Sequence, residues 1–287
     1  MISKIWKIFR EYMLIKGFFL KNINYGNYIQ NILTPHLNKK TYINLGAGIF
    51  HLKGWYMLDF DTPAYNYAKN KKFIQYDINS KTKLPFSNHS VDGIYCSHVI
   101  EHFKDDILAH LLAEFDRIVK KNCIVRIAVP DSSIAFRALK NNDHNFFIWD
   151  LWNSNQGRYK SFSKSIPKNW PIEYKWLHRF ATERVPDDIT PSKFKMNIDD
   201  LKSVIKKNGY IDLHNNISSD LKYRYEFSHN HINWYDYNKL EQIVSLNSNF
   251  KIQRSSYLQS IDSQMRVEGH FDTTWPQMTL YVDLIKK

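Results

Sequence analysis

The sequence predicts an α/β protein: a doubly wound, mostly parallel sheet with an antiparallel C-terminal edge hairpin and a large aromatic-rich cap insertion. Between residues 40 and 130, short apolar runs alternate with segments of helical periodicity. The apolar runs are nearly continuous, as in parallel strands that are buried on both faces. With 287 residues, 43% of them hydrophobic, the chain can form one such core and carry a long insertion.

The elements of the first half follow a regular order. Four apolar strands come first, at Tyr42–Leu45, Trp55–Leu58, Phe73–Tyr76 and Val91–Cys96. A helix is expected next, with Asp105 as its N-cap. Its apolar positions keep a helical period up to Lys120 and Lys121, namely Ile107, Leu108, Leu111, Leu112, Phe115, Ile118 and Val119. A fifth strand, Cys123–Val129, is stopped by Pro130. This alternation predicts the parallel part of the sheet.

Residues 132–236 break the alternation. They contain many Tyr, Phe, Lys and Asn residues, together with Trp149, Trp152, Trp170, Trp176 and Trp234. A helix is expected at Ile198–Lys207, but no further parallel strand stands out, so the stretch predicts a cap over the sheet. The alternation then resumes with a helix at Tyr237–Leu246 and strands at Phe250–Ser256 and Met278–Ile285. The last two strands predict a hairpin at the sheet edge.

We divide the chain into an N-terminal amphipathic helical segment at 1–36, a ligand-binding core at 37–131, the cap at 132–236 and the rest of the core sheet at 237–287. The first segment carries an apolar stripe, formed by Ile2, Ile5, Trp6, Phe9 and Met13. A helix packed on its own domain explains this stripe, and we favour it over contact between residues 1–20 and a membrane surface. No apolar run reaches the ~20 residues needed to span a bilayer.

Charge and cysteine content limit the partners and the compartment. The net charge is +12, which suits an acidic partner such as phosphate, nucleic acid or anionic lipid. The basic residues are mostly lysines scattered among Asn and Ile, and no basic stripe alternates with aromatics, so we favour biased composition over nucleic-acid binding. The two cysteines, Cys96 and Cys123, lie inside apolar runs. The lack of a disulfide framework fits a reducing, cytoplasmic compartment, including the inner face of the membrane.

A glycine turn follows the first strand in the segment Asn44-Leu45-Gly46-Ala47-Gly48. Glycine lets the backbone approach a ligand closely. The turn has no third glycine and no long helix behind it, so it is poorly suited to pyrophosphate. Asp59 ends the second strand, where a carboxylate can accept both hydroxyls of a ribose, and Asp77 ends the third, where it can accept from an adenine amino group. Together these features favour an adenosyl ligand without phosphates.

The run LPFSNHSVDGIYCSHVIEHF, residues 84–103, admits two interpretations. The segment from His98 to His102 matches H-x-x-E-H, a zinc-protease pattern. Such a site needs a further ligand, and neither Glu114 nor the later histidines form a motif with it. The run is also the end of a buried strand, where open α/β sheets bind ligands. We favour the strand end, expect no metal, and expect Glu101 and His102 to brace the next helix rather than to act in catalysis.

These segments together carry a family resemblance. The chain resembles class I S-adenosylmethionine-dependent methyltransferases, in particular a bacterial branch associated with surface polysaccharide biosynthesis. The matching segments are INLGAG, GWYMLDFD, YDI, LPFSNHSVDGIYCSHVIEHF, LLAEFDRIVKKNCIVRIAVPD and MTLYVDLIKK, in residues 41–131 and the C-terminal part. The resemblance implies a Rossmann-like core and S-adenosyl-L-methionine as the cofactor. Two departures are Lys121-Asn122 in place of the usual Pro-Gly-Gly turn and the length of the 132–236 insertion.

The resemblance also implies roles for particular residues. Gly46 and Gly48, with Asn44 at the start of their turn, would approach the methionine part of the cofactor, whereas Asp59 would bind the ribose and Asp77 the adenine. Ser97 and His98 would lie near the sulfonium.

Methyl transfer to oxygen or nitrogen releases a proton, so a histidine base is expected. The first candidate is His98, and the second is His231 or its neighbour His229. For each of them, an ordinary packing or solvated histidine is an equal alternative. Further candidates for the acceptor site are Asp131, Arg179 and Arg184, although the two arginines are also ordinary surface charges.

The expected acceptor is a small molecule or a sugar-nucleotide or glycan-type compound. Two alternatives remain open. A nucleic-acid methyltransferase would suit the charge, but the fourth strand lacks the Asn/Asp-Pro-Pro-aromatic motif used on amino groups of bases. A catalytically silent adenosyl-binding scaffold would keep the same cofactor residues.

Overall fold

The computed structural model describes residues 39–48, 50, 52–60, 72–147, 170–184 and 196–287. The predicted N-terminal helix, together with Trp149 and Trp152, lies outside these residues. Among the described residues, no helix is long and apolar enough to cross a membrane.

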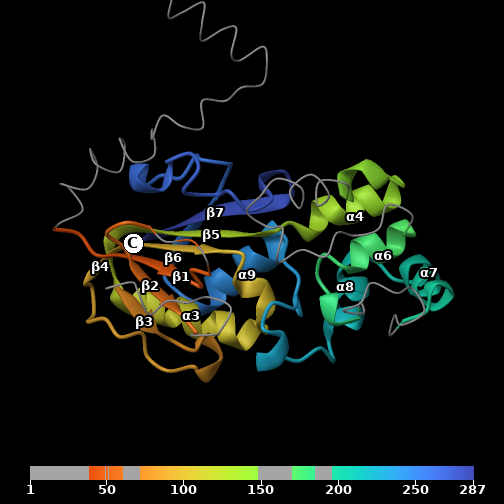
Figure 1. Ribbon diagram of the computed structural model, residues 1–287, viewed down its shortest axis with the longest axis horizontal. Coiled ribbons are helices and arrows are strands. Elements are labelled where there is room, and N and C mark those ends of the chain that lie inside the picture. The colour runs from red at the N-terminus through yellow and green to blue at the C-terminus, as the bar shows by residue number, and fades with distance from the viewer. Residues whose placement is uncertain (1–38, 49, 51, 61–71, 148–169, 185–195) are drawn as a thin grey trace, which may run out of the picture.

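The core is a seven-stranded sheet with the order β3-β2-β1-β4-β5-β7-β6 (Figure 1). The strands are β1 (Tyr42–Leu45), β2 (Tyr56–Asp59), β3 (Phe73–Gln75), β4 (Val91–Ser97), β5 (Val119–Pro130), β6 (Phe250–Ser255) and β7 (Thr279–Lys286). The strands from β3 to β5 pair in parallel, and β7 runs antiparallel to β5 and to β6. This arrangement confirms the predicted fold, including the edge hairpin, and is Rossmann-like.

The strand β5 begins at Val119 rather than at the predicted Cys123. The preceding helix ends at Ile118, so the chain enters the strand without a loop. The expected turn at Lys121-Asn122 lies inside the strand, where Asn122 has a φ of +62°. Asparagine tolerates this left-handed conformation better than most residues. The pairing of β4 with β5 shifts register opposite this point, between Val91 and Gly93.

The helices are α3 (Asp105–Ile118), α4 (Ser132–Lys140), α6 (Ile172–Leu177), α7 (Ile198–Lys207), α8 (Tyr210–Ser218) and α9 (Tyr237–Asn247). The N-cap prediction for α3 was wrong, because Lys104 occupies that position and Asp105 is the first helical residue. The Asp105 carboxylate instead accepts a hydrogen bond from the Asn233 side chain at 2.8 Å and pairs with Lys239 at 3.1 Å. An acidic side chain in the first turn also suits the helix dipole.

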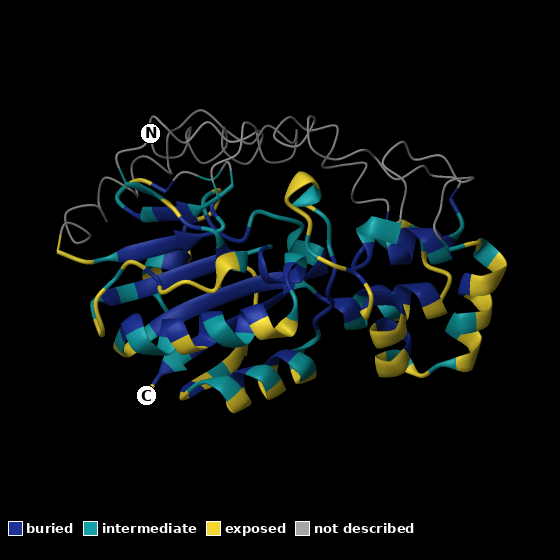
Figure 2. Cartoon of the chain, turned by 90° about the horizontal axis from the view of Figure 1, so that it is seen from below, coloured by how far each residue is buried: buried dark blue, intermediate teal, exposed yellow. Residues whose placement is uncertain are grey.

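The two faces of the sheet are covered differently. On one face, α3 and α9 pack against the apolar side chains of the parallel strands and form the main core, which includes Leu111, Phe115 and Leu240. On the other face, the segment between β6 and β7 contributes Met265 and Phe271 to a second cluster, formed with Tyr42, Leu52, Trp55, Tyr95 and Val267. The central strands, β1, β4, β5 and β7, are largely buried between these layers, whereas the outer strands β3 and β6 are partly exposed (Figure 2).

A fully buried ion cluster fixes the antiparallel edge. Arg126, in the middle of β5, donates hydrogen bonds to Asp272 at 2.9 Å and to Asp283 at 3.0 Å, and all three residues have 0% exposure. Its guanidinium also lies 5.0 Å from the centre of the Tyr281 ring. Burial opposes the charged form, but the two carboxylates raise the pKa of Arg126 above its ordinary value.

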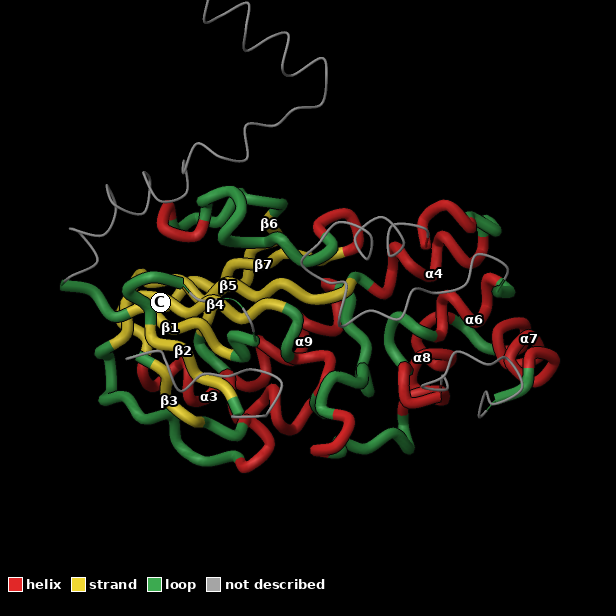
Figure 3. The backbone as a smooth tube through the Cα atoms, viewed as in Figure 1, coloured by secondary structure: helices red, strands yellow, loops and turns green. Residues whose placement is uncertain are grey.

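The insertion forms a helical cap at one end of the sheet (Figure 3). Its described part has an apolar core of its own, which includes Trp170, Trp176, Leu201, Leu213 and Trp234. The described tryptophans of the insertion therefore belong largely to this core. The side chain of Trp176 is also one wall of a cavity beside the sheet.

Candidate active site

The glycine turn after β1 packs closely against the end of β4. The Gly46 amide donates to the Leu58 carbonyl at 2.8 Å, and Gly46 has a φ of +62°. A Cβ atom at this position would lie 2.4 Å from Val99 Cγ2, so only glycine fits. Gly48 also has a positive φ, of +50°, but a Cβ there would meet no atom within 4 Å. The turn is therefore tight at Gly46 and open at Gly48.

Two polar side chains predicted as ligand-binding also hold this turn in place. Asp59 accepts hydrogen bonds from the backbone amides of Gly48 and Phe60, both at 2.7 Å. The buried Asn44 side chain donates to the Phe50 carbonyl at 3.0 Å. At the end of β2, the Asp59 carboxylate therefore accepts hydrogen bonds from two backbone amides.

A cavity of about 270 Å³ adjoins this turn, and we call it the glycine-loop cavity. It lies at the carboxyl ends of β1 and β4, where a parallel sheet binds ligands. Its lining residues are Asn44, Gly46, Ala47, Phe50, Tyr95, Ser97, His270, Thr273 and Thr274. None of these described residues is Lys or Arg, so the cavity suits a ligand without phosphate groups.

Asp77 lies at the end of β3 and has two partners. Its Oδ1 accepts the Asn79 amide at 2.9 Å, as the cap of a short 3-10 helix. Its Oδ2 accepts the Tyr225 hydroxyl at 2.7 Å, and this bond raises the pKa of Tyr225. The Tyr225 ring lies 5.6 Å from the Phe60 ring, directly after Asp59. Aromatic and carboxylate groups thus gather beside the ends of β2 and β3.

A second cavity, of about 420 Å³, lies between the sheet and the cap, and we call it the cap cavity. It brings together four of the predicted site residues: His98, Asp131, Arg179 and His231. The remaining lining residues are Pro130, Ser132, Ala135, Phe146, Trp176, Phe180, His214, Trp275 and Met278. Its walls combine aromatic faces with a few polar groups, as is usual for small-molecule sites.

Two other predicted site residues do not line this cavity. Arg184 forms an ion pair with Asp220 and donates from Nε to the Ile217 carbonyl at 2.8 Å. His229 lies near the Phe227 ring, with a centroid distance of 6.5 Å. Arg184 is thus bound within the cap, away from the cap cavity.

Asp131 and Arg179 lie at the wall of the cap cavity, and both side chains interact with neighbouring protein groups. Asp131 caps α4 by accepting the Ser133 amide at 2.9 Å, and its other oxygen lies 3.5 Å from Arg254. The Arg179 guanidinium lies 5.7 Å from the ring centre of Trp275, in cation–π geometry. Arg179 is only 7% exposed, so its charge is held at the cavity rather than at the surface.

His98 directly follows β4 and has an unusual backbone, with a φ of +54°. Its Nε2 lies 3.1 Å from the Thr274 carbonyl and 3.0 Å from the Thr279 hydroxyl. Thr279 itself donates to the carbonyls of Thr274 and Trp275. Since a carbonyl only accepts, this network places the proton of the neutral ring on Nε2. Nδ1 then carries a lone pair.

Glu101 lies at the centre of a histidine cluster and is 1% exposed. Its Oε1 is 3.2 Å from His98 Nδ1 and 3.8 Å from His231 Nε2. Burial acts to raise the pKa of Glu101, but the charges and hydrogen-bonding capacity of His98, His102 and His231 lower it to about 2. Burial lowers the pKa of His231 to about 3, so this ring is neutral near pH 7.

The backbone of the same segment braces the cap connection. The Glu101 carbonyl accepts the amides of Ile232 at 3.0 Å and Asn233 at 3.1 Å, and a ring nitrogen of His102 lies 3.0 Å from the Asn230 carbonyl. The short 3-10 helix Ile100–His102 is thereby tied to the 230–233 segment. Glu101 and His102 do brace a neighbour, although it is this segment rather than the following helix.

Sequence reasoning missed two residues of the cap cavity. Trp275 has a φ of +39°, immediately before Pro276, and its ring packs edge-on to His98 at 5.8 Å. His214 is 0% exposed and is surrounded by aromatic rings of the cap. Trp275 lies in the loop before the last strand, and nothing in its local pattern marks it. The helical spacing of α8 gave a weak signal for an inward position of His214.

Comparison with known proteins agrees with this geometry. Residues 48–127 match the family model of a methyltransferase domain. Among curated proteins, none matches the chain. The chain is an enzyme of the methyltransferase class, and S-adenosylmethionine is its cofactor.

Solved structures with a similar course of the chain share little sequence with it. A SAM-dependent methyltransferase from Archaeoglobus fulgidus is 11% identical, with a TM-score of 0.40 over 91% of this chain and 94% of the other. A protein from Pyrococcus horikoshii OT3 is 15% identical, with a TM-score of 0.40 over 96% and 99% of the two chains. A SAM-dependent methyltransferase from Aquifex aeolicus is 9% identical, with a TM-score of 0.37 over 90% and 89%.

The residues of the glycine-loop cavity fit this cofactor. The buried Asn44 and the tight backbone at Gly46 form part of its lining, and the Asp59 carboxylate lies beside the same turn, bonded to the Gly48 amide. Among the described lining residues no cation opposes a positively charged sulfonium.

Proposed function

We propose that the protein transfers a methyl group from S-adenosylmethionine to an oxygen or nitrogen of a small acceptor of the sugar, sugar-nucleotide or glycan type. The observation that carries this proposal is the meeting of the two cavities. Ser97 and Thr274 line the glycine-loop cavity, and their chain neighbours His98 and Trp275 line the cap cavity. Two ligands bound in these cavities would thus meet at the end of β4.

When bound, the cofactor supplies an activated methyl group on its sulfonium. The protein's task is to align the acceptor with that group and to remove a proton, and alignment alone contributes several kcal/mol in such reactions. In this proposal Asn44, Gly46, Gly48 and Asp59 bind the cofactor, with Asp77 at its adenine and Ser97 near its sulfonium. His98 is the first candidate for taking the proton, because it stands where the cavities meet. His231 shares the cap cavity and is the second.

The cap cavity supports a sugar-type acceptor. Aromatic side chains such as Trp176, Trp275 and Phe180 offer faces on which a sugar ring can stack, and Asp131 offers a hydroxyl acceptor. Arg179 adds a held positive charge that suits the phosphate of a sugar nucleotide. A role in surface polysaccharide synthesis, in the cytoplasm or at the inner face of the membrane, follows from the same proposal.

The proposal is tested by incubating the protein with isotope-labelled cofactor and a panel of sugar nucleotides, glycans and small metabolites, followed by mass spectrometry. We expect label in a sugar-type acceptor, and loss of that label in Trp275→Ala while cofactor affinity stays within twofold of wild type. Label in nucleic acid, with a salt-dependent gel shift, would support the nucleic-acid alternative instead. Cofactor binding without transfer to any member of the panel would favour the silent scaffold.

A further inference from the structure

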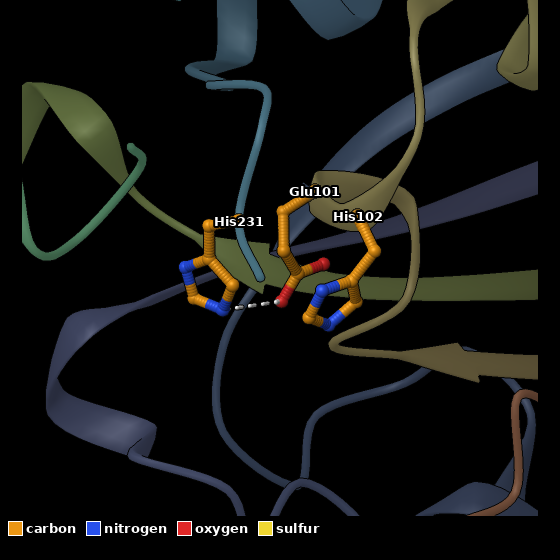
Figure 4. Close-up of side chains that lie close together, drawn as sticks. All are labelled: Glu101, His102 and His231. Carbon is orange, nitrogen blue, oxygen red and sulfur yellow. Dashed lines mark ion pairs between the residues drawn. The ribbon is translucent and has the colours of Figure 1, made fainter. Parts of the chain in front are cut away.

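Three potential metal ligands converge beneath the cap cavity. Glu101, His102 and His231 each offer one ligand atom, and these atoms all lie within 4.8 Å of one another (Figure 4). The geometry points to a binding site for a divalent transition-metal ion of the Zn²⁺ type between these three side chains. The site itself does not depend on the methyltransferase assignment, but its role, given below, rests on the proposed function.

The first argument is the arrangement of lone pairs around the Glu101 carboxylate. His231 Nδ1 lies 2.7 Å from the Arg179 carbonyl, which only accepts, so Nδ1 carries the proton and Nε2 presents a lone pair. That Nε2 faces Glu101 Oε1 at 3.8 Å. His102 Nδ1 lies 3.0 Å from the Asn230 carbonyl, which likewise leaves the lone pair of the neutral ring on Nε2. These lone pairs lie near the Glu101 carboxylate, and a cation between the three side chains would convert repulsion into binding.

The second argument is that the carboxylate lacks hydrogen-bond partners. Both oxygens of Glu101 and the Nδ1 atom of His98 are buried, and none forms a hydrogen bond within the described part of the chain. Buried charges in proteins are normally paired or coordinated to metals, because desolvation without compensation is costly. Glu101 is thus an unsatisfied ligand that points into the cluster.

The third argument is that the cluster resembles metal sites beyond its ligands. Histidine ligands usually donate their second ring nitrogen to a carbonyl or carboxylate, as His231 does to Arg179. The 230–233 segment that carries His231 is fixed to Glu101 through the Ile232 and Asn233 amides. A preformed scaffold of this kind reduces the cost of arranging the ligands.

The ligand types indicate which ion fits. Two imidazoles and one carboxylate suit Zn²⁺ and related transition metals, whereas Ca²⁺ and Mg²⁺ prefer oxygen ligands only. Metal–ligand bonds of about 2.1 Å in a tetrahedral site place ligand atoms roughly 3.4 Å apart. His231 Nε2 and Glu101 Oε1 are 3.8 Å apart, and all three ligand atoms lie within 4.8 Å of one another, so the side chains move inward to complete the shell. Three protein ligands leave a fourth position open.

The open position gives the ion a role in the proposed reaction. His98 and His231 line the cap cavity, so an ion between Glu101 and His231 lies at its wall. Such an ion binds an acceptor hydroxyl and lowers its pKa, which eases loss of the proton during methyl transfer. This narrows the acceptor to an oxygen nucleophile such as a sugar hydroxyl.

The test is titration of the metal-stripped full-length protein with Zn²⁺, by calorimetry and by competition with a chromophoric chelator. Co²⁺ replaces Zn²⁺ in a second arm, where visible d–d absorption reports the coordination geometry. We expect one ion per chain, and a loss of affinity of at least about tenfold in Glu101→Gln and His231→Ala. His110→Ala, a half-buried histidine on α3 outside the cluster, is the matched control and keeps the wild-type affinity.

Each variant is also titrated with S-adenosylmethionine, so that a folding defect is recognised by lost cofactor affinity. If a variant loses cofactor affinity, the Co²⁺ spectrum of the wild type shows whether the metal site exists. Imidazole and carboxylate ligation in a four-coordinate site gives intense absorption bands. The inference is overturned if wild type binds no ion, if Glu101→Gln binds as tightly as wild type, or if the Co²⁺ spectrum is that of the hydrated ion. Cofactor binding and methyl transfer that persist in chelator would also refute the catalytic role, while leaving the proposed function intact.

Discussion

The Ile232 amide donates a hydrogen bond of 3.0 Å to the Glu101 carbonyl, and this bond joins the return of the cap to the end of β4. Glu101 lies in the 3-10 helix directly after the strand that carries Ser97 and His98. Ile232 lies one residue after His231. The same short connection therefore fixes two histidines of the cap cavity relative to each other.

Replacing Arg126 should unfold the antiparallel edge first. Arg126→Met leaves Asp272 and Asp283 buried without their shared cation, which costs on the order of 3–5 kcal/mol. Urea unfolding followed by circular dichroism measures the loss. Lys251→Ala on the edge strand β6 is the control, because an exposed substitution changes stability by about 0.5 kcal/mol or less. Equal stability of the two variants would show that the cluster does not hold the edge.

The two glycines of the cofactor turn should differ in their sensitivity to alanine. Gly46→Ala meets both an unfavourable φ of +62° and Val99 at 2.4 Å, whereas Gly48→Ala meets only the unfavourable φ. Left-handed strain costs about 1–3 kcal/mol, and the contact with Val99 adds to it. We expect the midpoint of thermal unfolding to fall further in Gly46→Ala, and to recover partly in the double variant with Val99→Ala. No recovery would mean that the contact with Val99 is not the cause.

Loss of the Asp59 carboxylate should weaken cofactor binding. Asp59→Ala removes the acceptor for the Gly48 amide and for ribose hydroxyls. Hydrogen bonds to a charged group contribute about 1.5–3 kcal/mol, so we expect the Kd for S-adenosylmethionine to rise at least about tenfold in calorimetry. Asp212→Ala on the exposed face of α8 serves for comparison and should bind like wild type. Full affinity for S-adenosylmethionine in Asp59→Ala would contradict the proposed role of Asp59 in cofactor binding.

The cap should lose stability on acidification through His214. Burial lowers the pKa of His214 to about 4, against 6.5 for an unperturbed histidine. The unfolded chain therefore takes up a proton near pH 6.5, and the folded chain only near pH 4. The stabilising contribution is complete above pH 6.5 and is lost as the pH falls to about 4, by roughly 3 kcal/mol.

Urea unfolding between pH 4 and 8 measures how the free energy of unfolding changes with pH. This free energy should change less with pH in His214→Phe than in wild type, since phenylalanine takes up no proton. His110→Gln should follow the wild-type profile. An unchanged slope in His214→Phe would assign the acid sensitivity to other groups, of which His178 is the next candidate because burial lowers its pKa to about 3.

Much of the core was predictable from local pattern. Tyr42–Leu45 is found as predicted, and Ile198–Lys207 forms the predicted helix with Asn197 as its cap. Continuous apolar strands and polar residues at their ends identify a parallel sheet and its binding edge without any long-range information. The element ends were less accurate, as at Val119 and Asp105, because neighbouring segments compete for those residues.

The candidate site was predictable only in part. His98 and His231 were selected from their positions in the chain, and the structure brings both to the cap cavity. No sequence pattern connects Glu101 with His231, since the two lie far apart along the chain. It also could not show that Arg126, inside an apolar strand, is matched by Asp272 and Asp283.

The sheet, its edge hairpin and the glycine turn follow from local patterns, because they depend on periodicity, on glycine conformation and on residues close together in the chain. Which distant side chains meet depends on tertiary packing. The cap leaves the core after Asp131 and returns before Tyr235, which pairs beside it. This closure places His231 against Glu101. The cluster of Glu101 and His231 therefore depends on contacts between distant parts of the chain, which no local sequence pattern predicts.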